Sequence, residues 1–142
     1  MKFSKKAEYA VILCSELAFC DKNRSLREIA GHCEISYAFL RKVAHLLAEA
    51  KIVAGEEGKN GGYRLEKPAD EVTLREILVA AGESMAHQPC CDGSRDCSGS
   101  AVCPRNSILF TLQSAVDEMF GSLTLDRMLK GEGSCLKLWK GL

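Results

Sequence analysis

Two short amphipathic segments, followed at once by a hairpin signal, constrain the fold of this chain more than any other feature. Ser25 and Glu28 have the spacing of a helix-capping box, and apolar residues recur at helical spacing after them. Residues 33–35 form a short connector, and Ser36 is placed to cap a second helix that runs through Ala50. Two short helices joined by a connector of about four residues form a helix-turn-helix.

The segment that follows predicts two strands and a tight turn. Residues 51–55 are strand-like, residues 57–62 form a Gly-rich turn with an Asn-Gly pair, and residues 63–65 return as the second strand. A hairpin directly after the second helix of a helix-turn-helix is the wing of a winged helix. We therefore expect a mainly α fold with a small β-hairpin wing, opened by a helix over residues 4–19 that Ser4 caps.

The start of the second helix is expected to present side chains suited to DNA, because this end enters the major groove in a helix-turn-helix. Arg41 and Lys42 suit guanine O6 and N7 or phosphate, and Ser36 and Tyr37 suit phosphate or base edges. A solvated helix face, with plain turn chemistry at the wing tip, is the alternative. The candidate DNA-binding residues are Ser36, Tyr37, Ala38, Arg41, Lys42, Lys59, Asn60 and Gly61.

Bulk charge does not by itself predict a nucleic-acid partner. The formal net charge of the 142 residues is zero, and residues 1–80 carry 13 Lys and Arg against 12 Asp and Glu. Binding to double-stranded DNA therefore depends on a local basic face. An enzyme is not expected, because the chain has only three His and shows neither a nucleophile–base spacing nor a phosphate-binding Gly-rich loop before a helix.

The C-terminal half predicts a dimerisation element. Thr73 and Glu76 form another capping box, for a helix that ends near Gly82, and a long amphipathic segment over residues 106–120 is ended by Gly121. The apolar stripe of this segment needs a partner, either the first helix or a second subunit, and we expect a homodimer. The expected divisions are residues 1–82 for the winged helix-turn-helix, 83–106 for a cysteine-rich loop and 107–142 for the dimerisation helix and tail.

Four of the eight cysteines lie within one polar stretch. Cys90 and Cys91 are adjacent, and five residues separate Cys91 from Cys97 and Cys97 from Cys103. The stretch has few apolar side chains and cannot order itself by burying a core. Thiolates are soft ligands that select iron–sulfur clusters, zinc or copper(I). We therefore expect a metal or cluster site, with redox exchange between thiols as the alternative.

The remaining cysteines and the start of the chain favour a reducing compartment. Cys14, Cys20 and Cys33 lie in helical patterns and are expected to pack as small hydrophobic residues. The first residues do not resemble a signal peptide, and no apolar run approaches the length that spans a bilayer. We expect a cytoplasmic protein without a membrane partner.

Several segments together resemble the IscR/NsrR type of winged-helix transcriptional regulators over essentially the full length. The opening Met-Lys-Phe-Ser resembles the family's Met-Arg-Leu-Thr start, and residues 58–65 resemble its Gly-x-x-Gly-Gly-Tyr-x-Leu signature. The spacing of Cys91, Cys97 and Cys103 resembles the family's cluster loop, and residues 123–125 resemble its C-terminal element. The resemblance implies a dimeric bacterial repressor or activator, and many such proteins hold a 2Fe–2S or 4Fe–4S cluster.

Carried over by position, the resemblance assigns Cys91, Cys97 and Cys103 as cluster ligands. Cys90 is the alternative to Cys91 as the first ligand. IscR-like members use a His three residues after the last cysteine, where this chain has Asn106, a poor iron ligand. Other members use an acidic residue of the first helix, supplied by the partner subunit, and Glu8 occupies that position. A solvated surface carboxylate is the alternative for Glu8.

The resemblance thus implies a sequence-specific regulator, expected to repress, whose DNA affinity is switched by an iron–sulfur cluster that senses cluster supply, iron, redox state or nitric oxide. One alternative is a cluster-free regulator with a thiol–disulfide switch. Another is an interaction module that has lost DNA binding, which the neutral charge and the acidic wing motivate. The family usually carries Arg before the first wing glycine, whereas this chain carries Glu57, with Glu56 beside it.

Overall fold

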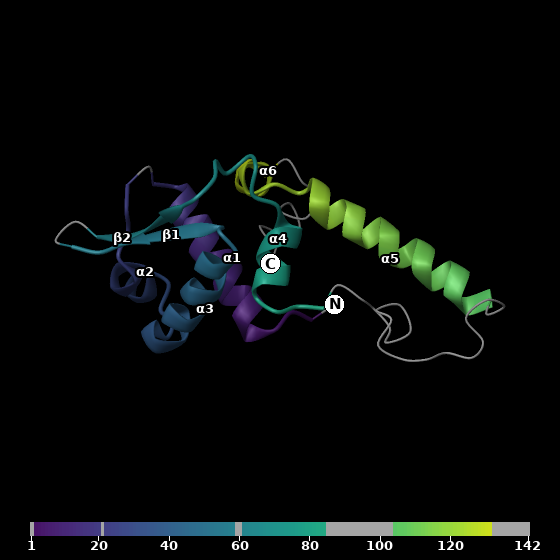
Figure 1. Ribbon diagram of the computed structural model, residues 1–142, viewed down its shortest axis with the longest axis horizontal. Helices are drawn as coiled ribbons and strands as arrows, with labels where there is room; N and C mark the ends of the chain where they lie inside the picture. The colour runs from purple at the N-terminus through teal and green to yellow at the C-terminus, as the bar shows by residue number, and fades with distance from the viewer. Residues whose placement is uncertain (1, 21, 59–60, 85–103, 132–142) are drawn as a thin grey trace.

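The computed structural model describes residues 2–20, 22–58, 61–84 and 104–131. In this part of the chain, six helices and one antiparallel hairpin form a winged helix from which a long helix projects (Figure 1). The prediction of a mainly α fold with a small β-hairpin wing is confirmed. The elements are α1 (Lys5–Ala18), α2 (Leu26–His32), α3 (Tyr37–Glu49), β1 (Val53–Glu56), β2 (Gly62–Leu65), α4 (Leu74–Ala80), α5 (Pro104–Ser122) and α6 (Leu125–Lys130).

Hydroxyl side chains set where α1 and α3 begin, as the sequence predicts. The Ser4 hydroxyl accepts a hydrogen bond from the Ala7 N–H at 3.3 Å, and the Ser36 hydroxyl accepts one from the Phe39 N–H at 3.4 Å. Each bond satisfies a backbone donor that the first helical turn otherwise leaves without a partner.

The two predicted capping boxes have different outcomes. Thr73 and Glu76 form the complete box at the start of α4, with each side chain accepting from the other residue's backbone N–H. Ser25 also caps its helix, α2, but its hydroxyl accepts from the Arg27 N–H. The predicted box between Ser25 and Glu28 is therefore wrong.

The turns after α2 and α3 both use a left-handed residue that is not glycine. Glu34 has φ 55° and follows the C-cap Cys33, and Lys51 has φ 57° and follows the C-cap Ala50. Helices commonly end with such a residue, and glycine is preferred there because it has no Cβ. This chain therefore makes the turn of its helix-turn-helix with a glutamate.

Backbone pairing ties the wing to the segment before α2. Strands β1 and β2 are antiparallel, with Val53 opposite Leu65 and Glu56 opposite Gly62. On the other side of β2, Arg24 and Tyr63 exchange two backbone hydrogen bonds of 2.9 and 2.8 Å. The wing is therefore tied to the segment before α2 at Tyr63, in addition to its two ends.

The core lies where α1 packs against α3 and α4. Cys14 is fully buried there, as predicted, and burial raises the pKa of its thiol to about 12. Cys20 is exposed, so the expectation that it packs as a small hydrophobic residue is wrong, because α1 ends at Ala18 and the chain turns away. Phe19, the last apolar residue of the α1 pattern, is exposed for the same reason. The largest fully buried side chains include Leu13, Ile29, Leu40, Leu47, Ile52, Ile77, Leu78 and Leu125.

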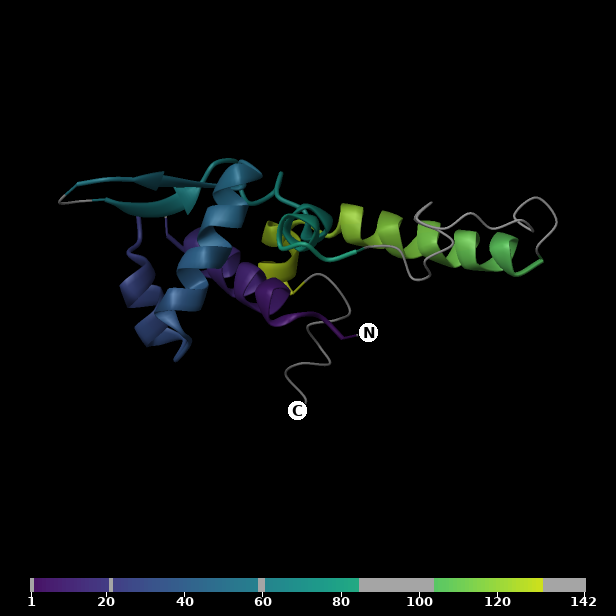
Figure 2. The same cartoon turned by 60° about the horizontal axis from the view of Figure 1, so that its bottom comes forward.

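Helix α5 is anchored at its C-terminal end, and the rest of it extends away from the winged helix (Figures 1 and 2). Phe120 is buried, with its ring centroid 6.3 Å from that of Phe3, and Arg75 Nε donates to Asp117 Oδ1 at 2.6 Å. The helix continues through Ser122, so the prediction that Gly121 ends it is wrong. None of the helices in the described segments is long and apolar enough to cross a membrane.

Candidate nucleic-acid interface

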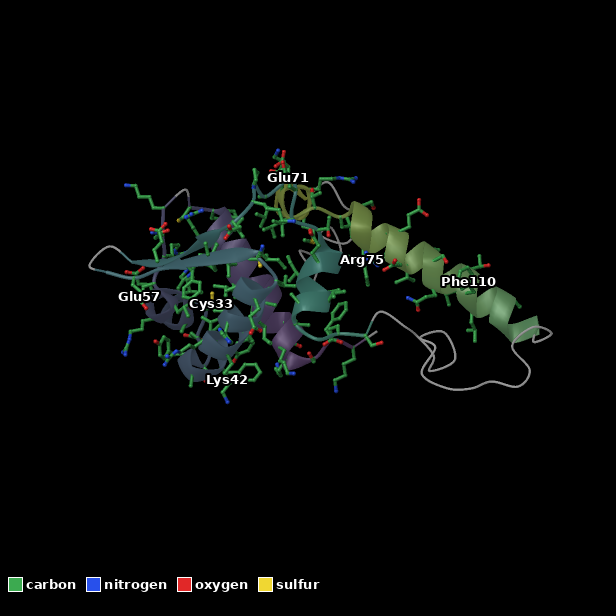
Figure 3. The ribbon with its side chains drawn as sticks, in the orientation of Figure 1. Cys33, Lys42, Glu57, Glu71, Arg75 and Phe110 are labelled. Carbon is green, nitrogen blue, oxygen red and sulfur yellow. The ribbon has the colours of Figure 1, made fainter. Side chains whose placement is uncertain are left out.

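The N-terminal half of α3 presents the predicted side chains to solvent. Ser36, Tyr37, Ala38, Arg41 and Lys42 are all exposed, while Leu40, Val43 and Leu47 on the opposite side of the helix are buried. The amphipathic pattern of α3 therefore orients the candidate DNA-binding residues outward, as the sequence predicts. Figure 3 shows Lys42 at the edge of the winged helix, far from α5.

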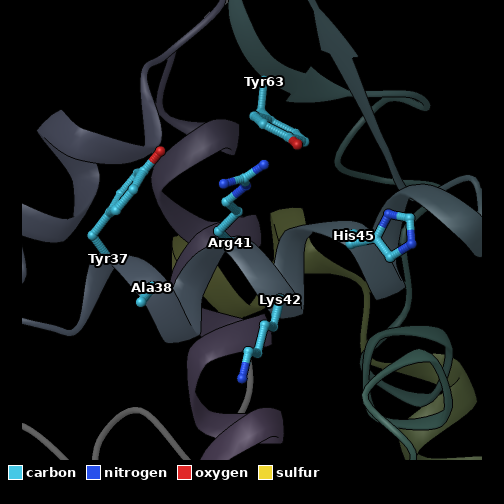
Figure 4. Close-up of a pocket in the computed structure, with 6 residues that line it drawn as sticks. All are labelled: Tyr37, Ala38, Arg41, Lys42, His45 and Tyr63. Atoms are coloured by element: carbon cyan, nitrogen blue, oxygen red, sulfur yellow. The ribbon is translucent and has the colours of Figure 1, made fainter.

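A groove of about 660 Å³ runs beside this face. Its lining is contributed by α3 and by one wing residue, Tyr63, and Figure 4 shows the Arg41 guanidinium directed toward the Tyr63 ring. Among the described residues, the lining includes the cations Arg41 and Lys42 and no carboxylate. An anionic ligand would therefore meet positive charge and two aromatic edges here. The lining residues are Tyr37, Ala38, Arg41, Lys42, His45 and Tyr63.

A second hollow continues the groove toward the start of α2 and the wing. It shares Tyr37, Arg41 and Tyr63 with the first and adds Ser25 and Arg27 among others. The Arg27 guanidinium carbon lies 4.9 Å from the centroid of the Tyr37 ring. This cation–π contact places a further positive charge at the mouth of the groove and fixes the orientation of Tyr37.

Gly61 and Gly62 of the wing line this hollow, and both positions have no room for a side chain. A Cβ on Gly61 would collide with the backbone carbonyl of Glu56, and a Cβ on Gly62 would lie 2.7 Å from the carbonyl oxygen of Arg24. Gly61 is therefore required by the turn of the wing itself, and Gly62 by the close approach of the wing to the segment before α2. Lys59 and Asn60, the other two predicted wing contacts, lie outside the described residues.

The wing carboxylates differ in how they are held. The Glu56 carboxylate accepts from Asn23 Nδ2 at 2.6 Å and from Arg64 Nε at 3.3 Å. The Asn23 hydrogen bond, followed by that from Arg64, lowers the pKa of Glu56. Its negative charge is therefore paired on the wing, and the repulsion expected from two acidic residues is reduced to that of Glu57, which is exposed.

Glu8, the predicted fourth cluster ligand, lies on the first turn of α1. Its carboxylate forms an ion pair with Lys5 Nζ at 2.6 Å, and about half of the side chain is exposed (47%). The side chain can therefore be reached from outside the subunit. The loop thiols of Cys90, Cys91, Cys97 and Cys103 lie outside the described residues, and Asn106 lies in the first turn of α5.

The residue after Glu8 connects α1 to the candidate DNA-binding face. The Tyr9 hydroxyl accepts a hydrogen bond from the Ser36 N–H at 3.3 Å, and its ring packs edge-on against Phe39 with centroids 4.9 Å apart. The start of α3 is thus held by α1 through Tyr9.

Sequence reasoning omitted two residues that line the groove, His45 and Tyr63, and it also omitted Arg27 of the second hollow. Tyr63 and Arg27 reach this surface from β2 and α2, so they meet α3 only through tertiary packing. The helical period offered a signal for His45, which lies four residues after Arg41 on the same face of α3.

The hairpin beside the second helix, the exposed cationic face and the groove between them define a winged helix-turn-helix protein. The family model described as "Iron-dependent Transcriptional regulator", Rrf2, matches residues 3–131. The chain therefore belongs to the Rrf2 family of transcriptional regulators.

Relatives and solved structures agree with this family. The chain is 28% identical over 132 residues to the HTH-type transcriptional regulator IscR of Vibrio campbellii, covering 92% of this chain and 78% of the relative. It is 28% identical over 141 residues to the HTH-type transcriptional regulator NsrR of Oceanobacillus iheyensis, covering 97% and 96%.

Two of the similar solved structures are each 25% identical to this chain. One is T. potens IscR, with a TM-score of 0.70 and coverage of 95% of this chain and 90% of that chain. The other is the oxidized form of Staphylococcus aureus CymR, with a TM-score of 0.68 and coverage of 90% and 95%. The predicted likeness to IscR and NsrR regulators is confirmed by these matches.

Proposed function

We propose that this chain is a homodimeric transcriptional repressor that binds operator DNA through α3 and the wing, and whose DNA affinity is switched by an iron–sulfur cluster. The observation that carries the DNA-binding role is the groove between α3 and the wing, lined by Arg41 and Lys42 with Arg27 at its mouth. Arg41 and Lys42 would contact base edges or phosphates, and Ser36, Tyr37 and Ala38 would approach the same groove of DNA. Lys59, Asn60 and Gly61 of the wing would contact the backbone beside it.

Replacing Arg41 tests the DNA-binding role. The probe is a duplex selected by the full-length protein from a random-sequence library, and binding is measured by fluorescence anisotropy over a range of salt concentrations. Arg41→Ala is expected to cost roughly 1–3 kcal/mol of binding free energy if the side chain reads a base, or to lower the salt slope by about 1 if it contacts a phosphate.

The matched control is Arg127→Ala, which removes an exposed arginine of α6, an element that contributes nothing to the groove. This variant is expected to bind the selected duplex as the unaltered protein does. Equal affinity of the Arg41→Ala variant and the unaltered protein, at every salt concentration, would contradict the assignment of α3.

The donor set fits an iron–sulfur cluster. Cys91, Cys97 and Cys103 would supply three thiolates, with Cys90 as the alternative first ligand. Glu8 fits the fourth place because its carboxylate is accessible and its present partner, Lys5, is itself exposed and free to rotate away. When bound, the cluster supplies an iron centre that reacts with oxidants and nitric oxide, and a carboxylate ligand leaves one iron more labile than thiolates do.

Helix α1 offers a short route from the fourth ligand to DNA. Glu8 and Tyr9 are adjacent, and Tyr9 holds the N–H of Ser36 and the ring of Phe39 at the start of α3. A displacement of the first turn of α1 would therefore move the start of α3. The two α3 helices of a dimer must contact two DNA half-sites that lie a fixed distance apart. A small rotation of α3 in each subunit therefore changes DNA affinity.

Glu8→Ala tests the fourth ligand. The variant is expected to keep its fold, since the side chain is exposed, but to lose its cluster faster in air or on exposure to nitric oxide. Visible absorbance followed over time, with iron and sulfide analysis of anaerobically purified protein, measures the loss. Lys5→Ala is the control, because it removes the ion pair while leaving the carboxylate. An unchanged spectrum and lifetime in Glu8→Ala would exclude Glu8 as a ligand.

A thiol–disulfide switch is the second candidate, favoured by the likeness to the oxidized form of S. aureus CymR. Two thiols among Cys90, Cys91, Cys97 and Cys103 would then exchange with a small-molecule disulfide, forming one protein disulfide and releasing two small-molecule thiols, and no iron would be needed. Protein purified without oxygen would be colourless and free of iron and sulfide, and would resist reconstitution. Visible absorbance with matched iron and sulfide would instead support the cluster.

A further inference from the structure

Three potential metal ligands outside the cysteine-rich loop gather where the end of α1 meets the end of α2. Glu16 lies in the last turns of α1, His32 is the last residue of α2, and Cys33 is the C-cap of α2. One ligand atom from each residue lies within 4.8 Å of the other two, and His32 Nδ1 is 3.2 Å from Glu16 Oε2. The fold therefore brings together Glu16 and His32, which lie 16 positions apart in the sequence.

The chemistry of the three donors suits a borderline-soft divalent cation. Thiolate, imidazole and carboxylate together form the ligand set that Zn²⁺ takes in proteins, at about 2.0–2.3 Å from the ion. Tetrahedral geometry at these bond lengths places ligand atoms roughly 3.3–3.8 Å apart. His32 is exposed and Cys33 is half-buried, so both side chains can make the small contraction that binding requires.

Arg24 holds the carboxylate of Glu16 in place. Its Nη1 donates to Glu16 Oε2 at 2.6 Å and to the Glu16 backbone carbonyl at 3.3 Å, while its own backbone is paired with Tyr63 of the wing. The Glu16 side chain is mostly buried and cannot swing away. Metal-ligating carboxylates are commonly oriented by such outer hydrogen bonds, which leave the second oxygen for the ion.

We propose that Glu16, His32 and Cys33 form a binding site for one thiophilic divalent cation, Zn²⁺ in particular, independent of the cysteine-rich loop. The site lies within the winged helix, far from α5 (Figure 3). Three protein ligands leave a fourth position for water. An ion here joins the ends of α1 and α2 beside the left-handed turn at Glu34, and so stabilises the helix-turn-helix.

Cobalt(II) binding to the full-length protein tests the site. The starting protein carries Ser at positions 90, 91, 97 and 103, so that the loop thiols do not bind metal. It is expected to bind one Co²⁺ ion, seen as an S–Co charge-transfer absorption and the visible bands of tetrahedral Co²⁺. Added Zn²⁺ is expected to displace the Co²⁺ and remove these bands.

Two variants of this protein test the ligands. Cys33→Ser is expected to abolish the charge-transfer absorption, and His32→Gln is expected to weaken Co²⁺ binding at least tenfold. Zn²⁺ is expected to raise the Tm of the starting protein and not that of Cys33→Ser.

Cys20→Ser is the matched control, because Cys20 is an exposed cysteine close to the end of α1 that does not belong to the group of Glu16, His32 and Cys33. It is expected to leave both spectra and affinity unchanged. Far-UV circular dichroism verifies the fold of each variant, and the exposed His32 tests the site even if Cys33→Ser unfolds. Absence of the S–Co band in the starting protein, its persistence in Cys33→Ser, or undiminished affinity in His32→Gln would each overturn the proposal and leave an ordinary ion-pair network.

Discussion

Glycine positions in the wing show how single residues set the interface. The Gly61 and Gly62 sites meet different backbones, that of the wing and that of the segment before α2. The second contact matters more for function, because the Arg24–Tyr63 pairing that Gly62 permits places Tyr63 at the groove. A side chain at Gly62 would push the wing away from α2 and open the hollow between them.

Gly62→Ala is therefore expected to lower the free energy of unfolding by about 1–3 kcal/mol, the usual cost of forcing an extra methyl group into a packed site. It is also expected to weaken DNA binding. Chemical denaturation and anisotropy with the selected duplex measure the two effects. Gly31→Ala is the control: its Cβ would meet no atom within 4 Å, and it lies inside α2, so it should stabilise the protein by roughly 0.5–1 kcal/mol. Equal stability of the two variants would contradict this account of the wing.

At the start of α4, a single side chain, that of Glu76, accepts three hydrogen bonds. The Glu76 carboxylate accepts from the Thr73 N–H at 2.9 Å and from the Thr73 hydroxyl at 3.1 Å, and it pairs with Lys67 Nζ at 2.7 Å. Partial burial raises the pKa of Glu76, but the hydrogen bonds from Lys67 and Thr73 outweigh burial and lower it. The capping box thus links α4 to the chain segment that leaves the wing.

This lowered pKa predicts a loss of stability in acid. A carboxyl group with a lowered pKa in the folded state stabilises the protein above its ordinary pKa of 4.5, and the stabilisation is lost as pH falls through the lowered value. The Tm of the unaltered protein is expected to fall below pH 4.5 more steeply than that of Glu76→Gln. Glu71→Gln, at a neighbouring exposed glutamate, should follow the unaltered protein. Parallel curves for the unaltered protein and Glu76→Gln would show that the capping carboxylate does not drive the acid transition.

At the scale of the whole molecule, α5 carries an apolar seam that the other described elements of the subunit leave exposed. Ile108, Leu112 and Met119 are 70%, 50% and 46% exposed, and Ala115 is exposed between them. Their separations of four, three and four residues place all four on one side of a helix, as in a coiled-coil seam. Phe120, on a different side, is the residue that α5 buries against its own subunit. We infer that the seam packs against α5 of a second copy.

The unaltered protein is expected to be a dimer, and Ile108→Glu combined with Leu112→Glu is expected to be a monomer, because dimerisation would bury two carboxylates without partners in the seam. Size-exclusion chromatography with light scattering measures the mass. Ser114→Glu adds one carboxylate to an exposed residue of α5 outside the seam and is expected to remain dimeric. A dimer that survives the double substitution would place the subunit interface elsewhere.

The sequence by itself determined the features that depend on neighbours a few residues apart. The hydroxyl caps at Ser4, Ser36 and Thr73 form as predicted, because a cap needs only a side chain and an N–H two or three residues ahead. The wing was predictable for the same reason, since the Asn-Gly turn and the flanking strands are local. The outward face of α3, with Arg41 and Lys42, followed from helical periodicity alone.

Only the tertiary structure decided which distant residues meet. Tyr9 lies against Ser36, Arg24 against Tyr63, and Glu16 against His32. These contacts depend on the directions in which helices cross and on where each chain segment turns, and no short spacing in the sequence encodes either. The same reason explains why Phe19 continues the periodicity of α1 and yet is exposed: periodicity continues past the residue at which the helix ends, whereas burial requires an opposing surface.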